Sequence, residues 1–363
     1  MKGNAADFEP GAPSSSSRGP PPIDGDEDGG RGQDHGGDGR DDHGDQRGDP
    51  NEADKDFVKV PSLEEYMENM VFTFIHHYSG SEDRLAEAIQ KEAKRRGVRV
   101  KCISADISQG DDLLAPQPFE EHMKMAADGE VDGFHAGWPC TTFSRLRWRP
   151  SPGLPGPVRS KTFPNGFISN SANQQAECDR GTLFLARSLA MGQKVTESRG
   201  PGIGGAFYTF ENPPPSGVEQ HLSAWEMPEY LAFMERHHPR HVDFNTCCYE
   251  EDLEIGKRHF KPQRFAGNLH NLLSLKDVCR CGDAGHDPIV GSAKSKASAA
   301  YPRALARDYA VLAVSHFKAV GKFEHLKIKH TFMEAPRQNH GDREGQGCGL
   351  GTQGQDKGHQ ENL

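Results

Sequence analysis

The stretch Val71-Phe72-Thr73-Phe74-Ile75 decides the fold of this chain. Its β-branched and aromatic residues form an unbroken apolar run, which is typical of a strand buried on both faces of a sheet. The run ends at Tyr78-Ser79-Gly80-Ser81, where we expect a turn and then a helix capped by Ser79 or Ser81. A second apolar run over residues 98–103 follows that helix and ends at Asp106. Strand, helix and strand in this order predict a βαβ unit, the opening of a doubly wound parallel sheet.

The rest of the central region continues the alternation of strands and helices. Apolar runs predict further strands, and apolar residues at helical spacing predict further helices. The strands are expected at 131–136 and 207–210, and the helices at 119–129, around 183–190, at 225–236 and at 303–320. Residues 145–176 are rich in Arg, Pro, Gly and Asn and are expected to form a long mobile loop. The predicted fold class is therefore α/β, with a doubly wound Rossmann-like sheet.

The two ends of the chain differ from this region in composition. Residues 1–56 carry 15 acidic and 6 basic side chains, so most of the net charge of −10 lies there. Aliphatic residues are scarce in the same stretch, which predicts a disordered acidic arm. Residues 331–363 are rich in Gly, Gln and His and are expected to form a disordered tail. One folded domain is expected between them, over residues 57–330.

The apolar runs and the cysteines indicate in which cellular compartment the protein is expected. The sequence has no apolar run of transmembrane length and no amino-terminal signal-peptide pattern, so no membrane contact is expected. Its eight cysteines lack the spacing of a disulfide framework. We therefore expect reduced cysteines and an intracellular protein.

Two polar motifs follow predicted strands and could share one site. Gly137-Trp138-Pro139-Cys140-Thr141-Thr142-Phe143-Ser144 follows the strand at 131–136, and Glu211-Asn212-Pro213 ends the strand at 207–210. The carboxyl ends of parallel strands meet at one edge of a sheet. A candidate nucleophile, Cys140, and a candidate acid, Glu211, are therefore expected at the same edge.

These motifs resemble the Pro-Cys and Glu-Asn motifs of the cytosine-C5 DNA methyltransferases, and the closest likeness is to divergent members in mobile elements and viruses. The resemblance covers most of residues 71–320, and it implies methyl transfer from S-adenosylmethionine to cytosine C5. It implies that Cys140 is the nucleophile, that Glu211 holds or protonates N3, and that Asn212 shapes the turn. The motif Lys261-Pro262-Gln263-Arg264-Phe265 is similar to the family's late basic motif, with Arg264 as its expected functional residue.

The resemblance also implies where the donor and the nucleic acid bind. The expected donor-binding residues are Phe74, Tyr78, Ser79, Gly80, Asp106, Asp112 and Pro139. The expected contacts to DNA are Arg145, Arg147 and Lys261, beside a small recognition segment at 265–300. A DNA substrate implies residence in the nucleus if the cell is eukaryotic.

Two alternatives and one metal site stay open at this point. The same chemistry on RNA is one alternative. A catalytically inactive nucleic-acid-binding domain of a mobile element is the other, and the absence of further glycines directly after Gly80 favours it. Cys279, Cys281 and His286 are a weak zinc candidate, with His270 or Asp283 as a fourth ligand. Cys247 and Cys248 are expected to pack at a strand end rather than bind metal.

Overall fold

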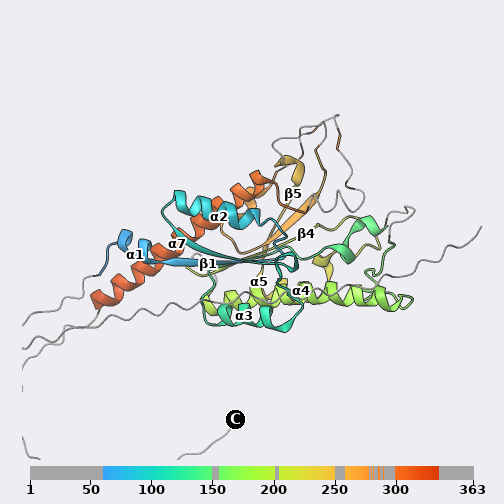
Figure 1. Cartoon of the computed structure of the whole chain (residues 1–363), viewed down its shortest axis with the longest axis horizontal. Helices are drawn as coiled ribbons and strands as arrows, with labels where there is room; N and C mark the ends of the chain where they lie inside the picture. The colour runs from blue at the N-terminus through green and yellow to red at the C-terminus, as the bar shows by residue number, and fades with distance from the viewer. Residues whose placement is uncertain are drawn as a thin grey trace, which may run out of the picture. The chain divides into compact units, whose positions relative to one another are not determined.

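The computed structural model describes residues 60–148, 155–200, 204–249, 258–277, 279, 281, 285–286, 289 and 299–334. These residues form an α/β fold with a six-stranded mixed sheet (Figure 1). The strands are β1 (Val71–His77), β2 (Arg99–Ala105), β3 (Gly133–Ala136), β4 (Phe207–Asn212), β5 (Arg240–Asn245) and β6 (Pro262–Gly267). The α-helices are α1 (Leu63–Asn69), α2 (Arg84–Arg95), α3 (Pro116–Ala127), α4 (Ala172–Arg199), α5 (Pro228–His237) and α7 (Arg303–Glu334).

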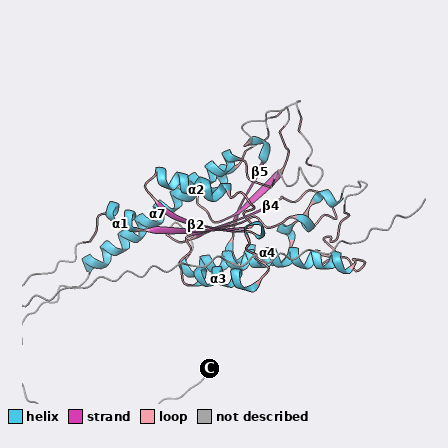
Figure 2. Ribbon diagram, in the orientation of Figure 1, coloured by secondary structure: helices cyan, strands magenta, loops and turns pink. Residues whose placement is uncertain are grey.

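The sheet has the strand order β2-β1-β3-β4-β6-β5. The strands β2, β1, β3 and β4 are parallel, whereas β6 runs antiparallel to both β4 and β5. Figure 2 shows the strands in magenta between the helices in cyan. The chain passes from β1 to β2 on one side and then crosses to β3 on the other side of β1. The order of strands therefore reverses between β1 and β3. In open α/β sheets, such a switch point is where ligands bind, beyond the carboxyl ends of the strands. The sheet is compatible with the Rossmann-like class expected from the sequence.

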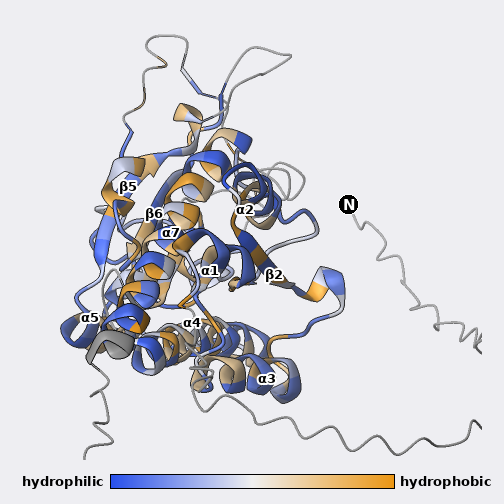
Figure 3. Cartoon of the chain, turned by 90° about the vertical axis from the view of Figure 1, so that its left-hand side faces the viewer, coloured by the Kyte–Doolittle hydropathy of each residue, from blue (hydrophilic) through white to orange (hydrophobic). Residues whose placement is uncertain are grey.

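Helices cover both faces of the sheet (Figures 1 and 3). On one face α2 and α7 pack over Phe72, Phe74 and Phe207, and all three phenyl rings are fully buried. On the other face α3, α4 and α5 pack over a second apolar cluster that contains Phe134 and Phe210. Full burial of a phenylalanine side chain contributes about 1.5–3 kcal/mol, so these rings hold the sheet rigidly between its helical layers.

Most of the predicted elements are confirmed, but three details differ. Asp83, not Ser79 or Ser81, caps α2, because its carboxylate accepts a hydrogen bond from the N–H of Ala86 at 2.9 Å. The region 145–176 is not loop throughout, since α4 begins at Ala172 with a capping box on Ser171. The last helix, α7, continues to Glu334, beyond the expected boundary at residue 330.

Several predictions concern residues outside the described ranges. The acidic arm at 1–56 and the tail from residue 335 onward fall there, as do parts of the segment at 265–300. Among the described helices, none has the length and apolar character needed to cross a membrane.

Candidate active site

Four chain turns meet at the carboxyl edge of the parallel strands. Residues 78–80 follow β1 and Asp106 follows β2, while Gly137 and Cys140 follow β3. Glu211 is the last residue but one of β4. The first and third of these turns flank the switch point between β1 and β3. The structure thus brings the sequence-predicted acid and nucleophile to the place where an α/β sheet binds ligands.

Cys140 lies at the start of a short 3-10 helix and is half-buried. Its carbonyl accepts a hydrogen bond from the N–H of Phe143 at 2.9 Å, which fixes the turn. Burial raises the pKa of the Cys140 thiol, the nearby Lys261 ammonium lowers it, and the Glu211 carboxylate raises it. The thiol, the acid and the ammonium therefore share one electrostatic environment. With burial as the largest effect, the resting thiol is protonated at neutral pH.

Glu211 is the second titratable group of the site. Burial raises the pKa of its carboxyl group, while Lys261, a hydrogen bond from Tyr301 and His76 each lower it. The hydroxyl of Tyr301 donates to Oε2 of Glu211 over a long distance of 3.5 Å. A carboxyl group with a raised pKa holds its proton more readily, and it can donate that proton to a basic ring nitrogen.

Gly137 allows Glu211 and Tyr301 to approach the turn that leads to Cys140. A Cβ atom at position 137 would lie 2.7 Å from the Tyr301 hydroxyl oxygen and 3.1 Å from Oε2 of Glu211. Such contacts are too close for any residue but glycine unless both side chains move. The glycine of the Pro-Cys motif therefore fits the close approach of the acid.

A chain of buried polar groups holds Tyr301 in place. Oγ1 of Thr209 lies 2.6 Å from the Tyr309 hydroxyl and 2.7 Å from Nδ1 of His135. On the other side of the ring, Nε2 of His135 lies 2.8 Å from the Tyr301 hydroxyl. Sequence reasoning missed His135 and Tyr301 as site residues. A polar histidine inside the apolar run 131–136 was the signal that could have found the first of them.

Asn212 supports the backbone of the Pro-Cys turn. Its side chain is buried, and its Nδ2 donates to the carbonyl oxygen of Trp138 at 3.0 Å. The ring nitrogen of Trp225 donates to the carbonyl of Pro213 at 2.9 Å, which secures the same corner. This hydrogen bond ties the Asn212 side chain to the turn that leads to Cys140.

The structure places Arg264 away from the acid. Arg264 pairs with Asn212 across the β4–β6 ladder, whereas Phe265 pairs with Glu211. Side chains alternate between faces along a strand, so Arg264 and Glu211 face opposite sides of the sheet. Nε and Nη2 of Arg264 instead donate to the two carboxylate oxygens of Asp243 at 2.6 and 2.8 Å. The expected role of Arg264 at the target base is corrected, and Lys261 is the basic residue that acts on Cys140 and Glu211.

The turn expected to bind the donor is held by its own hydrogen bonds. Tyr78 and Gly80 both have positive φ, at 61° and 74°. The N–H of Gly80 donates to Oδ2 of Asp106 at 3.0 Å, and the N–H of Ser108 donates to Oδ1 of the same carboxylate at 2.8 Å. The amide of Gln109 reaches Oγ of Ser79 at 3.2 Å and the carbonyl of Gly80 at 2.7 Å.

The other expected donor contacts are placed differently. The side chain of Phe74 is fully buried under α7 in the core, so its expected contact with the donor is corrected. Asp112 accepts a hydrogen bond from the N–H of Leu114 at 2.9 Å and caps the turn before α3. Pro139 is exposed beside Cys140.

The basic residues of the loop after Cys140 have unequal positions. Arg145 is half-buried in the short 3-10 helix at Arg145–Trp148. Arg147 is buried and ion-paired with Glu177 of α4. Its charge therefore anchors the loop to α4 rather than facing a phosphate, and the expected DNA contact of Arg147 is corrected.

The residues of the zinc candidate do come together. The side chains of Cys279, Cys281 and His286 lie beside Cys247, which follows β5. Cys247 is buried at a strand end, as expected, but its sulfur belongs to this cluster. His270 is exposed in a turn, and position 283 lies outside the described residues.

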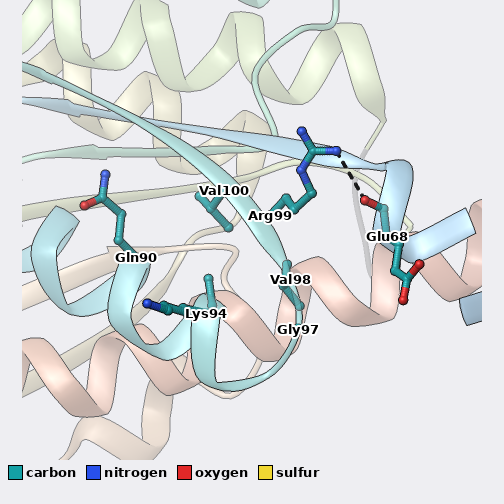
Figure 4. Close-up of a pocket in the computed structure, with 8 residues that line it drawn as sticks. Glu68, Gln90, Lys94, Gly97, Val98, Arg99 and Val100 are labelled. Carbon is teal, nitrogen blue, oxygen red and sulfur yellow. Dashed lines mark hydrogen bonds between the residues drawn. The ribbon is translucent and has the colours of Figure 1, made fainter. Parts of the chain in front are cut away.

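A surface pocket of about 410 Å³ lies at the other end of the strands (Figure 4). It is lined by residues from the end of α2 and the start of β2, including Lys94, Gly97 and Arg99. Nη1 of Arg99 donates to the carbonyl of Glu68 at 3.3 Å across it. Because it lies at the amino ends of β1 and β2, this pocket is separate from the edge that carries Cys140.

A comparison with protein families finds no family model that matches the chain, and a search of curated proteins finds no significant match.

Proposed function

We propose that this protein is a cytosine-C5 DNA methyltransferase that acts through a covalent adduct between Cys140 and the target base. One observation carries the proposal. Cys140, after β3, and Glu211, near the end of the neighbouring strand β4, share one electrostatic environment with Lys261 at the carboxyl edge of an α/β sheet. The order of these residues and their motifs resembles that of the cytosine-C5 methyltransferases.

The proposed chemistry follows from the weak nucleophilicity of cytosine. The Cys140 thiolate adds to C6 and Glu211 protonates N3, so that C5 gains the electron density of an enamine. S-adenosylmethionine, when bound, supplies a methyl group that C5 accepts. Loss of the C5 proton to a base and expulsion of the Cys140 thiolate then restore the ring, and N3 returns its proton to Glu211. The addition step is the one that needs a nucleophile and an acid on opposite parts of the target base.

The pKa directions fit these two roles unequally. The raised pKa of Glu211 favours the protonated acid that N3 requires. The raised pKa of Cys140 opposes formation of the thiolate in the resting protein. Lys261 lowers the pKa of Cys140, and the positive sulfonium of a bound donor would act in the same direction. We therefore propose that a bound donor promotes ionisation of the Cys140 thiol at neutral pH.

One residue beside the turn after β1, Asp106, is placed to bind the donor. Asp106 lies at the end of β2, where Rossmann-like folds bind ribose hydroxyls through an acid. Its Oδ1 accepts from both the N–H and the hydroxyl of Ser108, whereas Oδ2 accepts from the N–H of Gly80 and has a further lone pair to offer. Tyr78, Ser79 and Gly80 would form the adjacent wall. For DNA in a duplex, the base must leave the stack to reach Cys140, and Arg145 on the adjoining loop would contact the displaced strand.

A second candidate function is a nucleic-acid-binding domain without catalysis. The hydrogen bonds that close the β1 turn favour it, because a ligand must displace or share them. Calorimetry with S-adenosylmethionine separates the two candidates. Heat of binding supports the enzyme, and no heat at high donor concentration supports the binding domain.

A transfer assay tests the proposed function. The full chain is incubated with donor carrying a labelled methyl group and with duplex DNA or tRNA. We expect label at C5 of cytosine in DNA, and none with the Cys140→Ser variant. The matched control is Cys102→Ser, which alters a half-buried cysteine in β2 and should keep activity. Label in tRNA alone would assign the same chemistry to RNA, and label from Cys140→Ser at the wild-type rate would overturn the proposal.

A further inference from the structure

Three cysteines and one histidine converge beside the carboxyl end of β5. Cys247 lies in the 3-10 helix Thr246–Cys248, and its side chain is fully buried. Cys279, Cys281 and His286 come from a segment about thirty residues further along the chain. The four ligand atoms all lie within 4.8 Å of one another, and Sγ of Cys279 is 3.1 Å from Nε2 of His286.

We propose that Cys247, Cys279, Cys281 and His286 bind one structural Zn²⁺ ion. Three thiolates and an imidazole form a ligand set that structural zinc sites use. With Zn–S bonds of ~2.3 Å, the corners of a tetrahedral site are ~3.8 Å apart. The observed spacing is close to this, so small inward movements of the side chains complete the site. Soft thiolate ligands favour Zn²⁺ over Mg²⁺ or Ca²⁺, which prefer oxygen.

The arrangement is not explained by ordinary packing. The thiol group is a weak hydrogen-bond donor and acceptor, so three thiols in contact gain little from one another. Cys247 precedes β6 in the chain, whereas the other three residues follow it. Two cysteines one residue apart differ from the usual spacing of zinc motifs, which is why the sequence alone supports the site only weakly. The fourth ligand, Cys247, becomes visible only in the structure.

The ion would connect this cluster to the acceptor side of the active site. The N–H of Thr246, the residue before Cys247, donates to the carbonyl of Lys261 at 3.1 Å. The ring of Phe260, the residue before Lys261, lies 5.1 Å from the ring of His286. A bound ion would therefore fix Thr246, which is hydrogen-bonded to Lys261, and Phe260, which precedes Lys261 in the chain. This consequence rests on the proposed function, whereas the metal site does not.

Metal analysis of the full chain tests the site without any activity assay. Protein purified in reducing buffer should contain one zinc ion per chain by mass spectrometry. Replacement by Co²⁺ should give the charge-transfer and d–d bands of a tetrahedral thiolate site. Cys281→Ser and His286→Ala should each weaken zinc binding by more than about tenfold in chelator competition. Both residues are partly exposed, so these variants should fold.

Cys248→Ser is the matched control, because it changes the neighbouring cysteine whose sulfur is outside the cluster. It should retain zinc. Wild-type protein without zinc, whether its thiols titrate as free or as a disulfide, would overturn the proposal. Full zinc content in both Cys281→Ser and His286→Ala would also overturn it. Wild-type protein that contains zinc but transfers no methyl group would count against the proposed function alone.

Discussion

Two pairs of turns at one edge of the sheet are built in opposite ways. At the carboxyl ends of β3 and β4, burial raises the pKa of Cys140 and of Glu211, and the hydrogen bond from Tyr301 to Glu211 is long, at 3.5 Å. After β1 and β2, Gly80 and Asp106 are bonded to each other. The first pair forms the proposed acceptor side, whereas the second pair, on the proposed donor side, is closed by its own hydrogen bonds.

This difference between the two sides indicates that binding of the donor would cost free energy at the turn after β1. An internal hydrogen bond contributes about 0.5–1.5 kcal/mol net, so a donor that displaces two of them binds about tenfold or more weakly. On the acceptor side, the hydrogen bonds of His135 and Tyr301 are already formed and need no rearrangement. Preorganised groups of this kind are the ones that lower a reaction barrier.

The largest expected effect is on the acid. Glu211→Gln should lower methyl transfer by about 10²–10⁴-fold, because glutamine cannot protonate N3. The variant should be as stable as the wild type or more stable at neutral pH. A carboxyl group with a raised pKa favours the folded state only at low pH, and its burial as an anion opposes folding at higher pH. Labelled-methyl assays and thermal unfolding measure the two effects.

The control for this variant is Glu219→Gln, which changes an exposed glutamate. It should alter neither activity nor stability. Unchanged activity in Glu211→Gln would show that Glu211 is not the acid of the reaction. The proposed difference between the acceptor side and the donor side would then be wrong.

The next effect concerns the space beside the acid. Gly137→Ala should lower activity by about 10–100-fold, because its Cβ would press on the Tyr301 hydroxyl. That hydroxyl is held by His135 and has little freedom to move. The expected loss of stability is about 1–3 kcal/mol. Gly156→Ala is the control, since an added Cβ there has no atom within 4 Å and should leave activity intact.

A smaller effect is expected on the donor side. Asp106→Asn should weaken binding of S-adenosylmethionine by about tenfold, because it removes one acceptor oxygen from the turn. Calorimetry measures the change, with the exposed Asp128→Asn as control. Equal affinity in the two variants would place the donor away from the β1 turn.

The smallest expected effect is a change in the pKa of Cys140 and of Glu211. Lys261 lowers the pKa of both Cys140 and Glu211, so Lys261→Gln should raise both values. Alkylation of Cys140 at a fixed alkaline pH, followed by peptide mass spectrometry, should become slower. Lys94→Gln removes the same charge at the amino edge of the sheet and should leave the rate unchanged. An unchanged rate in Lys261→Gln would mean that the ammonium does not act on the thiol.

The strands that form the core could be predicted because burial on both faces leaves long apolar runs. The edge strand β5 was missed, since only Val242 and Phe244 of its six residues are apolar and buried. The strand β6 begins with a proline and contains Gln263 and Arg264, so its polar residues indicated a binding motif rather than a strand. Strands with polar residues are recognisable only from the partner that pairs with them.

Site residues at the ends of strands could be predicted from the sequence. Site residues whose position depends on the register between β4 and β6 could not. Cys140 and Glu211 both follow strands, so their common edge could be inferred. Whether Lys261 or Arg264 faces Glu211 depends on the antiparallel pairing of β4 with β6, and a shift of one residue reverses the faces. The contact of His135 with Tyr301 joins residues far apart in the chain, and no local pattern reports it.

A covalent trap tests the role of Cys140 most directly. The full chain is incubated with S-adenosylmethionine and duplex DNA that contains 5-fluorocytosine, in which the C5 fluorine cannot leave as a proton does. We predict a denaturant-resistant complex of protein and DNA, attached by peptide mapping to Cys140 and absent from the Cys140→Ser variant. A wild-type protein that binds donor and DNA yet forms no such complex would contradict the account.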